Sequence, residues 1–148
     1  MPVKIPEAMV EEHEEIHKEL RKATKVGGEV GRAAKQVAKV LHPHFERENE
    51  LVLPVIGVAR EVAEGKAPQD TPKALELCDK FKAEYEEMLQ GHVDIVKALE
   101  TLEVAARKAK KKDVIEFVGK LKLHAKTEED LTYPTVLMVG KLLKQGSQ

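Results

Sequence analysis

One stretch of the sequence occurs twice. Residues 44–54 and 124–134 both carry a His, a Glu four positions later, a Leu seven positions later and a Pro ten positions later. Positions four and seven apart lie on one face of an α-helix, so the His and Glu of each copy point in the same direction as the Leu, toward the residues that the Leu packs against. Burying such groups without partners costs several kcal/mol, and a shared metal ion is the most economical reason to do so. The polar pairs are His44 with Glu48 and His124 with Glu128.

The similarity between the two halves extends to the segment before each copy. A shift of 79 positions aligns His13 with His92, and the apolar residues around them align as well. Each half, about residues 6–64 and 72–144, is therefore expected to form a helical hairpin. Two hairpins predict an all-α, antiparallel up-down four-helix bundle with an internal pseudo-two-fold repeat. This arrangement would gather four His and two Glu between the helices.

The helices that must position these residues can be predicted from apolar periodicity and from Gly and Pro. Four long helices are expected over residues 6–25, from 29 into the 40s, 71–107 and from 113 onward, with short helical pieces after Pro54 and Pro134. Residues 65–72 form the one clear loop. Pro43 predicts a kink or bulge immediately before His44. Asp113 with Glu116 predicts a capping box.

Composition limits the classes of function. The chain of 148 residues is expected to form one domain, residues 1–148. Charged residues make up 34% but the net charge is −1, so nucleic acid and membrane surfaces are not expected partners. No apolar run is long enough for a membrane span, and the first ten residues lack the apolar segment of a signal peptide. With a single cysteine, the expected location is the cytoplasm.

A histidine taken alone is more often a surface or satisfied core residue than a ligand, but four histidines at matched inner positions favour a metal site. His42 lies on the opposite helix face from His44 and is expected to be exposed. His17, one turn after His13, is either a fifth ligand, a support for a ligand, or a residue at the rim; the rim or supporting role is favoured. Cys78 lies about 21 Å along the helix from His92 and is not an expected ligand.

The ordered set of residues resembles the hemerythrin-like, or HHE cation-binding, family. The match is His13, His44-x-x-x-Glu48, His92 and His124-x-x-x-Glu128, within residues 10–134. The resemblance implies a non-haem di-iron centre with two iron ions and a bridging oxo or hydroxo. It also implies that the four His are terminal ligands and that the two Glu bridge.

This sequence departs from the oxygen-carrying hemerythrins, which have a His-x-x-x-His pair on the third helix. The residues one turn either side of His92 are Met88 and Val96, so that pair is missing. The difference weighs against simple oxygen transport. Imidazole and carboxylate donors suit iron, manganese or zinc, with iron favoured by the resemblance, and the paired carboxylates favour two metals.

Two classes of function remain open. The first is a protein that binds dioxygen or another small diatomic for carriage, storage or sensing. The second is an enzyme that turns over hydrogen peroxide or nitric oxide, which needs a proton donor. Tyr85, two turns before His92, is the better candidate for this donor; Tyr133 is expected to lie off the inner face. A colourless holoprotein would instead indicate a structural module with zinc or manganese. The sequence leaves the oligomeric state open.

Overall fold

The computed structural model describes residues 5–146, and four long helices account for most of them. These helices are α1 (Glu7–Thr24), α2 (Gly28–Leu51), α5 (Thr71–Lys108) and α6 (Lys112–Thr127). The shorter elements are α3 (Leu53–Ile56), α4 (Ala59–Ala63), the π-helix η1 (Glu128–Thr132) and α7 (Tyr133–Gly146). Within this range no helix has both the length and the apolar character that crossing a membrane requires.

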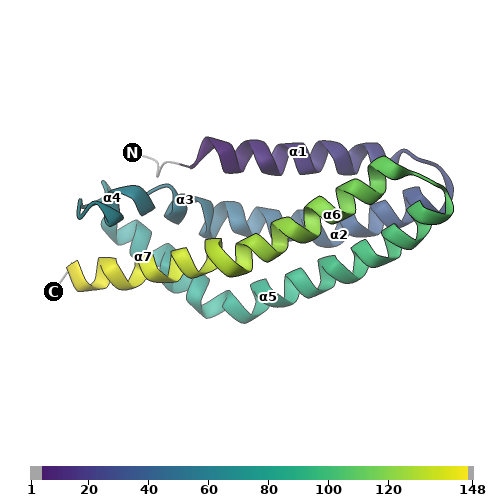
Figure 1. Cartoon of the computed structure of the whole chain (residues 1–148). Coiled ribbons are helices and arrows are strands. Elements are labelled where there is room, and N and C mark those ends of the chain that lie inside the picture. Colours follow the sequence, from purple (N-terminus) through teal and green to yellow (C-terminus); the bar gives the residue numbers. More distant parts are fainter. Residues whose placement is uncertain (1–4, 147–148) are drawn as a thin grey trace.

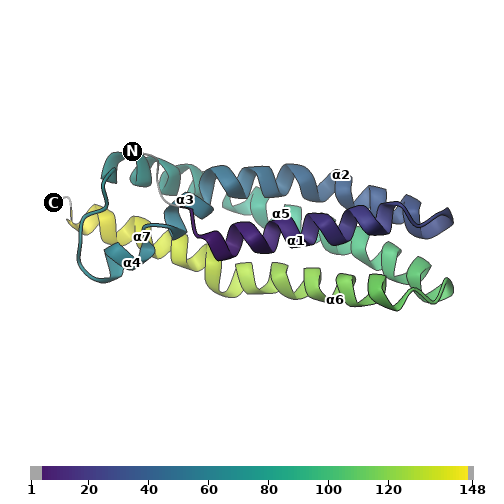
Figure 2. The same cartoon turned by 90° about the horizontal axis from the view of Figure 1, so that it is seen from above.

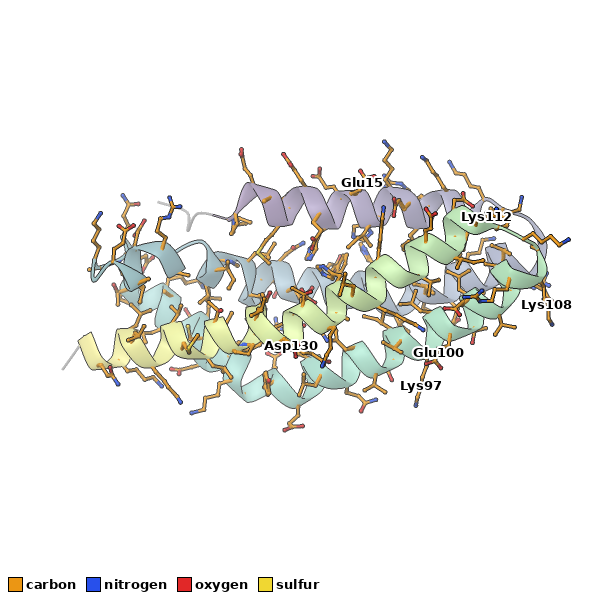
Figure 3. The ribbon with its side chains drawn as sticks, viewed as in Figure 1. Glu15, Lys97, Glu100, Lys108, Lys112 and Asp130 are labelled. Carbon is orange, nitrogen blue, oxygen red and sulfur yellow. The ribbon has the colours of Figure 1, made fainter. Side chains whose placement is uncertain are left out.

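The four long helices form two antiparallel hairpins that lie side by side (Figure 1). The turn between α1 and α2 and the turn between α5 and α6 lie at the same end of the bundle, where Lys108 and Lys112 flank the second turn (Figure 3). Helix α1 contacts both α2 and α6 and runs between them when the bundle is seen from above (Figure 2). The predicted four-helix bundle is therefore confirmed.

The helix boundaries follow from local chemistry in most places. Helix α5 begins after Asp70, whose carboxylate accepts a hydrogen bond of 3.0 Å from the backbone N–H of Lys73. The turn between α1 and α2 is made at Gly28, where a φ of +69° suits a residue without a Cβ. The capping box predicted at Asp113 is wrong, because α6 begins at Lys112 and no side chain caps its first turn.

Helix α2 runs through Pro43 without the bulge that the sequence predicts ahead of His44. Helix α6, by contrast, passes into α7 through η1 where no break was predicted before Pro134. Asp130 marks this junction in Figure 3. The π-helical geometry therefore lies in the second copy of the repeated stretch, whereas in the first copy α2 ends at Leu51 and α3 begins at Leu53.

Buried apolar side chains form two clusters with a polar layer between them. Along α2, the first cluster ends at Phe45 and the second begins at Leu51. The first cluster lies toward the hairpin turns and the second toward α3, α4 and α7. The side chains that are both polar and buried occupy the layer in between, and they are His13, His44, Glu48, His92 and Glu128.

Candidate metal centre

The six polar residues that the repeat singles out meet in the polar layer. Helix α1 supplies His13, α2 supplies His44 and Glu48, α5 supplies His92, α6 supplies His124, and η1 supplies Glu128. Glu48 is fully buried and Glu128 is 2% exposed, so both carboxylates lie deep inside the bundle. The side chain of His124 is 8% exposed and is the one nearest to solvent.

These residues form two overlapping groups, each able to surround one cation. The first group is His13, Glu48, His124 and Glu128, and the second is His44, Glu48, His92 and Glu128. In each group, the donor atoms all lie within 4.8 Å of one another. Both glutamates belong to both groups, whereas each His belongs to one. This arrangement is the one expected if two neighbouring cations share both carboxylates and each cation has two histidines of its own.

Several of the nitrogen and oxygen atoms that could bind a metal at the centre have no hydrogen-bond partner. Both ring nitrogens of His13 and Oε1 of Glu48 are buried without a hydrogen-bond partner, and Nε2 of His124 and Oε2 of Glu128 are buried 3.3 Å apart without forming a hydrogen bond. Most buried polar atoms in proteins are hydrogen-bonded, because leaving one unpaired costs several kcal/mol. A cation bound at each position would satisfy these atoms. The mixture of imidazole and carboxylate donors suits iron, manganese or zinc, so the residues present fit a metal centre.

The two carboxyl groups are coupled electrostatically. Burial raises the pKa of Glu48 well above its usual value, and the neighbouring Glu128 raises it further. Burial also acts to raise the pKa of Glu128, but contacts with Glu48, His124 and His92 outweigh it and hold that pKa below its usual value. The two opposite directions favour a proton on Glu48 and an ionised Glu128, and binding of a metal ion would displace that proton.

Burial also keeps two of the imidazoles uncharged at neutral pH. Burial, together with the neighbouring His92, lowers the pKa of His44 to about 4. The pKa of His13 is lowered by burial as well. Neutral imidazole is the form that binds metals, so these side chains are ready to act as ligands near pH 7.

Two histidines are oriented by carboxylates outside the central group, which the sequence analysis did not single out. Nδ1 of His92 lies 3.0 Å from Oε1 of Glu129, and Nδ1 of His124 lies 2.5 Å from Oε1 of Glu12. When Nδ1 donates to a carboxylate, Nε2 is left free to bind a metal inside the bundle. Each carboxylate adjoins a predicted ligand in the chain, because Glu129 follows Glu128 and Glu12 precedes His13.

Tyr133 also reaches the centre, contrary to the prediction that it lies off the inner face. Its ring is fully buried, and its hydroxyl donates to Oε2 of Glu48 at 2.8 Å. The hydroxyl oxygen of Tyr133 also lies 3.1 Å from Nε2 of His44 and 3.1 Å from Nε2 of His92. Burial raises the pKa of Tyr133 far above its usual value, and both glutamates add to the rise, so the metal-free hydroxyl stays protonated.

The π-helix η1 explains this placement. In η1 the backbone N–H of Tyr133 bonds to the carbonyl of Glu128, five residues earlier, so residues five apart share a face. Leu131, which the sequence places on the inner face, is instead 65% exposed. The sequence shows only that Tyr133 follows Glu128 by five positions, a spacing that is out of register in an α-helix, so helical periodicity does not indicate this contact.

Tyr85 and His17, which the sequence also suggests for the site, lie at its margin. Tyr85 is half-buried and packs edge-on against the rings of Phe81 and Tyr133, with centroid distances of 5.7 and 6.3 Å. His17 packs edge-on against Phe45 and lies in neither cation group. His42 is exposed, as predicted, and pairs with Glu46 at 3.0 Å.

Close packing holds two of the ligand rings. The ring of His13 stacks on Phe45 with centroids 4.0 Å apart and planes inclined by 6°. The ring of His44 lies against Gly91, where an added Cβ would stand 2.6 Å from Nδ1. A glycine inside the long helix α5 therefore has a specific structural reason, because another residue would collide with a candidate ligand.

A surface pocket leads toward one side of the centre. It has a volume of about 380 Å³, lies between α1 and α6, and reaches His124 and Glu128. Its walls include Met9, Ile16 and Leu123, and its acidic lining includes Glu12. Of the four histidines, His124 lines this pocket, so the pocket approaches the centre on the side of the group that contains His13 and His124.

Comparison with known proteins yields one match. The family model of the hemerythrin HHE cation binding domain matches residues 4–136 of the chain. No curated protein and no solved structure matches it. The matched range includes all six residues of the two cation groups.

Proposed function

This chain belongs to the hemerythrin HHE cation-binding domain family, and we propose that its polar layer holds two iron ions and binds dioxygen or a related small ligand. In this proposal, one iron lies in the group of His13 and His124 and the other in the group of His44 and His92. Glu48 and Glu128 bridge the two ions. The observation that carries the proposal is the overlap of two four-residue groups that share both glutamates.

The chain's own residues support the binding of a small ligand. The apolar clusters on either side of the layer keep bulk water from the ligands, which strengthens electrostatic interactions within the site. The pocket between α1 and α6 gives a path from solvent to His124 and Glu128. Two bound iron ions would supply the redox-active positions at which dioxygen, nitric oxide or peroxide binds.

One observation favours a second function, an enzyme that turns over hydrogen peroxide or nitric oxide. Such an enzyme needs a proton donor at the centre, and the protonated hydroxyl of Tyr133 contacts three donor atoms of one group. This makes Tyr133 a better candidate than Tyr85, whose ring lies behind it. Carriage, storage or sensing remains the first proposal, because the family match identifies cation binding and no reaction.

The test is metal content per chain together with a visible spectrum before and after exposure to oxygen and to peroxide. Two irons with a reversible oxygen-dependent band would support the binding protein. Two irons without an oxygen adduct, but with rapid consumption of peroxide or nitric oxide, would support the enzyme. No metal, or a single zinc, would contradict the di-iron proposal.

Substitutions test the ligands themselves. Glu48→Ala and Glu128→Ala should each lose one or both irons, because each removes a carboxylate common to both positions. Glu46→Ala is a suitable control, since Glu46 lies on the same helix as Glu48 but its side chain is 63% exposed. Two irons retained in both bridging variants would contradict the assignment.

A further inference from the structure

We infer that the phenol oxygen of Tyr133 is itself a ligand of the cation held by His44, His92 and Glu48, so that small ligands bind at the other cation. This inference rests on the proposed di-iron function and specifies which of the two positions is open. This role replaces that of proton donor, because a phenolate bound to a metal has no proton to give.

The first argument is the spacing of donor atoms around the hydroxyl. The phenol oxygen lies 2.8 Å from Oε2 of Glu48 and 3.1 Å from Nε2 of both His44 and His92. Ligand atoms that lie about 2.1 Å from one metal ion and subtend a right angle there are roughly 3.0 Å apart. The distance from the phenol oxygen to each of these three atoms is therefore the distance expected between two neighbouring ligand atoms of one metal ion.

The second argument is the number of partners. A phenol hydroxyl has one proton to donate, yet three potential metal-binding atoms converge on this one. The phenol oxygen could accept hydrogen bonds from the two imidazoles only if both Nε2 atoms carried protons, and those nitrogens could not then bind a metal. If these three atoms and the phenol oxygen all bind one metal ion, they are expected to lie close together in this way. On binding, the O–H bond is replaced by an oxygen–metal bond and the proton leaves to solvent.

The third argument is the asymmetry of access. The ring of Tyr133 stacks on His92, with centroids 5.2 Å apart and planes inclined by 13°, and is fully buried in the second apolar cluster. The pocket between α1 and α6 reaches His124 on the other side. Tyr133 would thus supply one further ligand atom to a cation held by His44 and His92, and a small ligand would reach a cation held by His13 and His124 from the pocket.

Iron-loaded full-length protein, oxidised in air, provides the test. Wild type is expected to show a visible phenolate-to-iron charge-transfer band, with tyrosine ring vibrations enhanced in resonance Raman spectra excited within it. Growth on ring-deuterated tyrosine should shift those vibrations. Tyr133→Phe should lose the band and keep two irons per chain. Tyr85→Phe is the matched control and should keep the band, because Tyr85 packs on Tyr133 without a hydrogen bond to the centre.

Azide, titrated into the same samples, tests which position is open. One azide per chain is expected in wild type and two in Tyr133→Phe. Wild type that holds two irons but shows no tyrosine vibrations would overturn the inference and leave the proposed function intact. Wild type that does not hold two irons would overturn both. Because the vibrational measurement is made on wild type, a Tyr133→Phe protein that fails to fold does not prevent the test.

Discussion

The backbone N–H of Tyr133 bonds to the carbonyl of Glu128, and this one contact decides what faces the centre. In a regular α-helix the partner of that N–H would be Glu129, and Tyr133 would be rotated away from Glu128. The π-helix places both side chains inside the bundle and turns Leu131 out to solvent. It acts as a single inserted residue between two stretches that are otherwise in register.

Deleting Leu131 should therefore keep the centre intact. The deletion places Tyr133 four positions after Glu128, which share a face in a regular α-helix. Stability should fall by about 3 kcal/mol, since Pro134 then interrupts an α-helix, but metal content should stay at two per chain.

The matched control is deletion of Leu123, which is 67% exposed compared with 65% for Leu131. It lies within regular α6, so its loss rotates His124 and Glu128 by about 100° relative to the first cluster. This variant should lose its metals. Equal losses of metal from both deletions would contradict the register argument.

Gly91→Ala should weaken metal binding. The added Cβ would stand 2.6 Å from Nδ1 of His44 and displace its ring. Gly119→Ala is the control, because nothing lies within 4 Å of the added Cβ on the exposed face of α6. That variant should gain roughly 0.5–1 kcal/mol in free energy of unfolding from helix propensity. Metal titration and denaturant unfolding of both variants would check the pair; a Gly91→Ala protein that binds metal normally would be inconsistent with it.

Glu12→Gln and Glu129→Gln should each weaken metal affinity by about 10- to 100-fold. Each loses the carboxylate that accepts from the outer nitrogen of a candidate ligand, His124 or His92. Glu15→Gln serves as the control, since Glu15 also lies on α1 (Figure 3) and lines the same pocket as Glu12, whereas the outer nitrogens of the two rings pair with Glu12 and Glu129. Competition with a chelator would measure the affinities. Unchanged affinity in the first two variants would show that these carboxylates do not support the ligands.

Removal of the metals should lower the melting temperature by roughly 10 °C. A ligand present at a thousand times its Kd stabilises the folded state by about 4 kcal/mol, and each kcal/mol shifts Tm by about 2–4 °C in a chain of this size. The unsatisfied atoms of His13 and Glu48 are part of the reason, because they regain no partner once the metal leaves. Calorimetry before and after chelation would test this, and identical melting curves would contradict a buried metal site.

The metal-free protein should lose stability on acidification through His44. Its pKa is about 4 in the folded state and about 6.5 when unfolded, so between these values the unfolded chain binds a proton that the folded chain does not. Stability from this group is therefore fully present above pH 6.5 and falls toward pH 4, with a slope of up to about 1.4 kcal/mol per pH unit. His44→Gln should lack this contribution. Unfolding free energies of both proteins over this range, with chelator present, would reveal it as a difference in slope.

The sequence predicts which six residues lie together, because they repeat at helical spacing. His-x-x-x-Glu occurs twice on regular helix faces, and the aligned His13 and His92 are anchored by apolar neighbours one turn away. The structure brings all six residues together through four helices whose boundaries differ from the predicted ones by a few residues.

The features of the site that could not be predicted depend on departures from helical spacing or on contacts between helices. Tyr133 and Leu131 exchange roles because η1 breaks the period of the helix, and no residue type marks a π-helix in advance. The outer carboxylate of Glu12 contacts His124, which belongs to another helix and lies more than a hundred positions away in the chain. The reason for Gly91 is likewise visible only once α2 and α5 are packed.

The polar layer also has a consequence for how the molecule folds. It divides the buried apolar residues into two clusters, and α5 contributes to both, with Phe81 in one and Leu99 in the other. Each cluster can bury apolar surface independently, so without metal each half has its own local stability. Bound ions, ligated from every long helix at once, would tie the halves into one cooperative unit. Amide protons on either side of the layer would then exchange at the rate of global unfolding, and metal loading would govern folding cooperativity as well as chemistry.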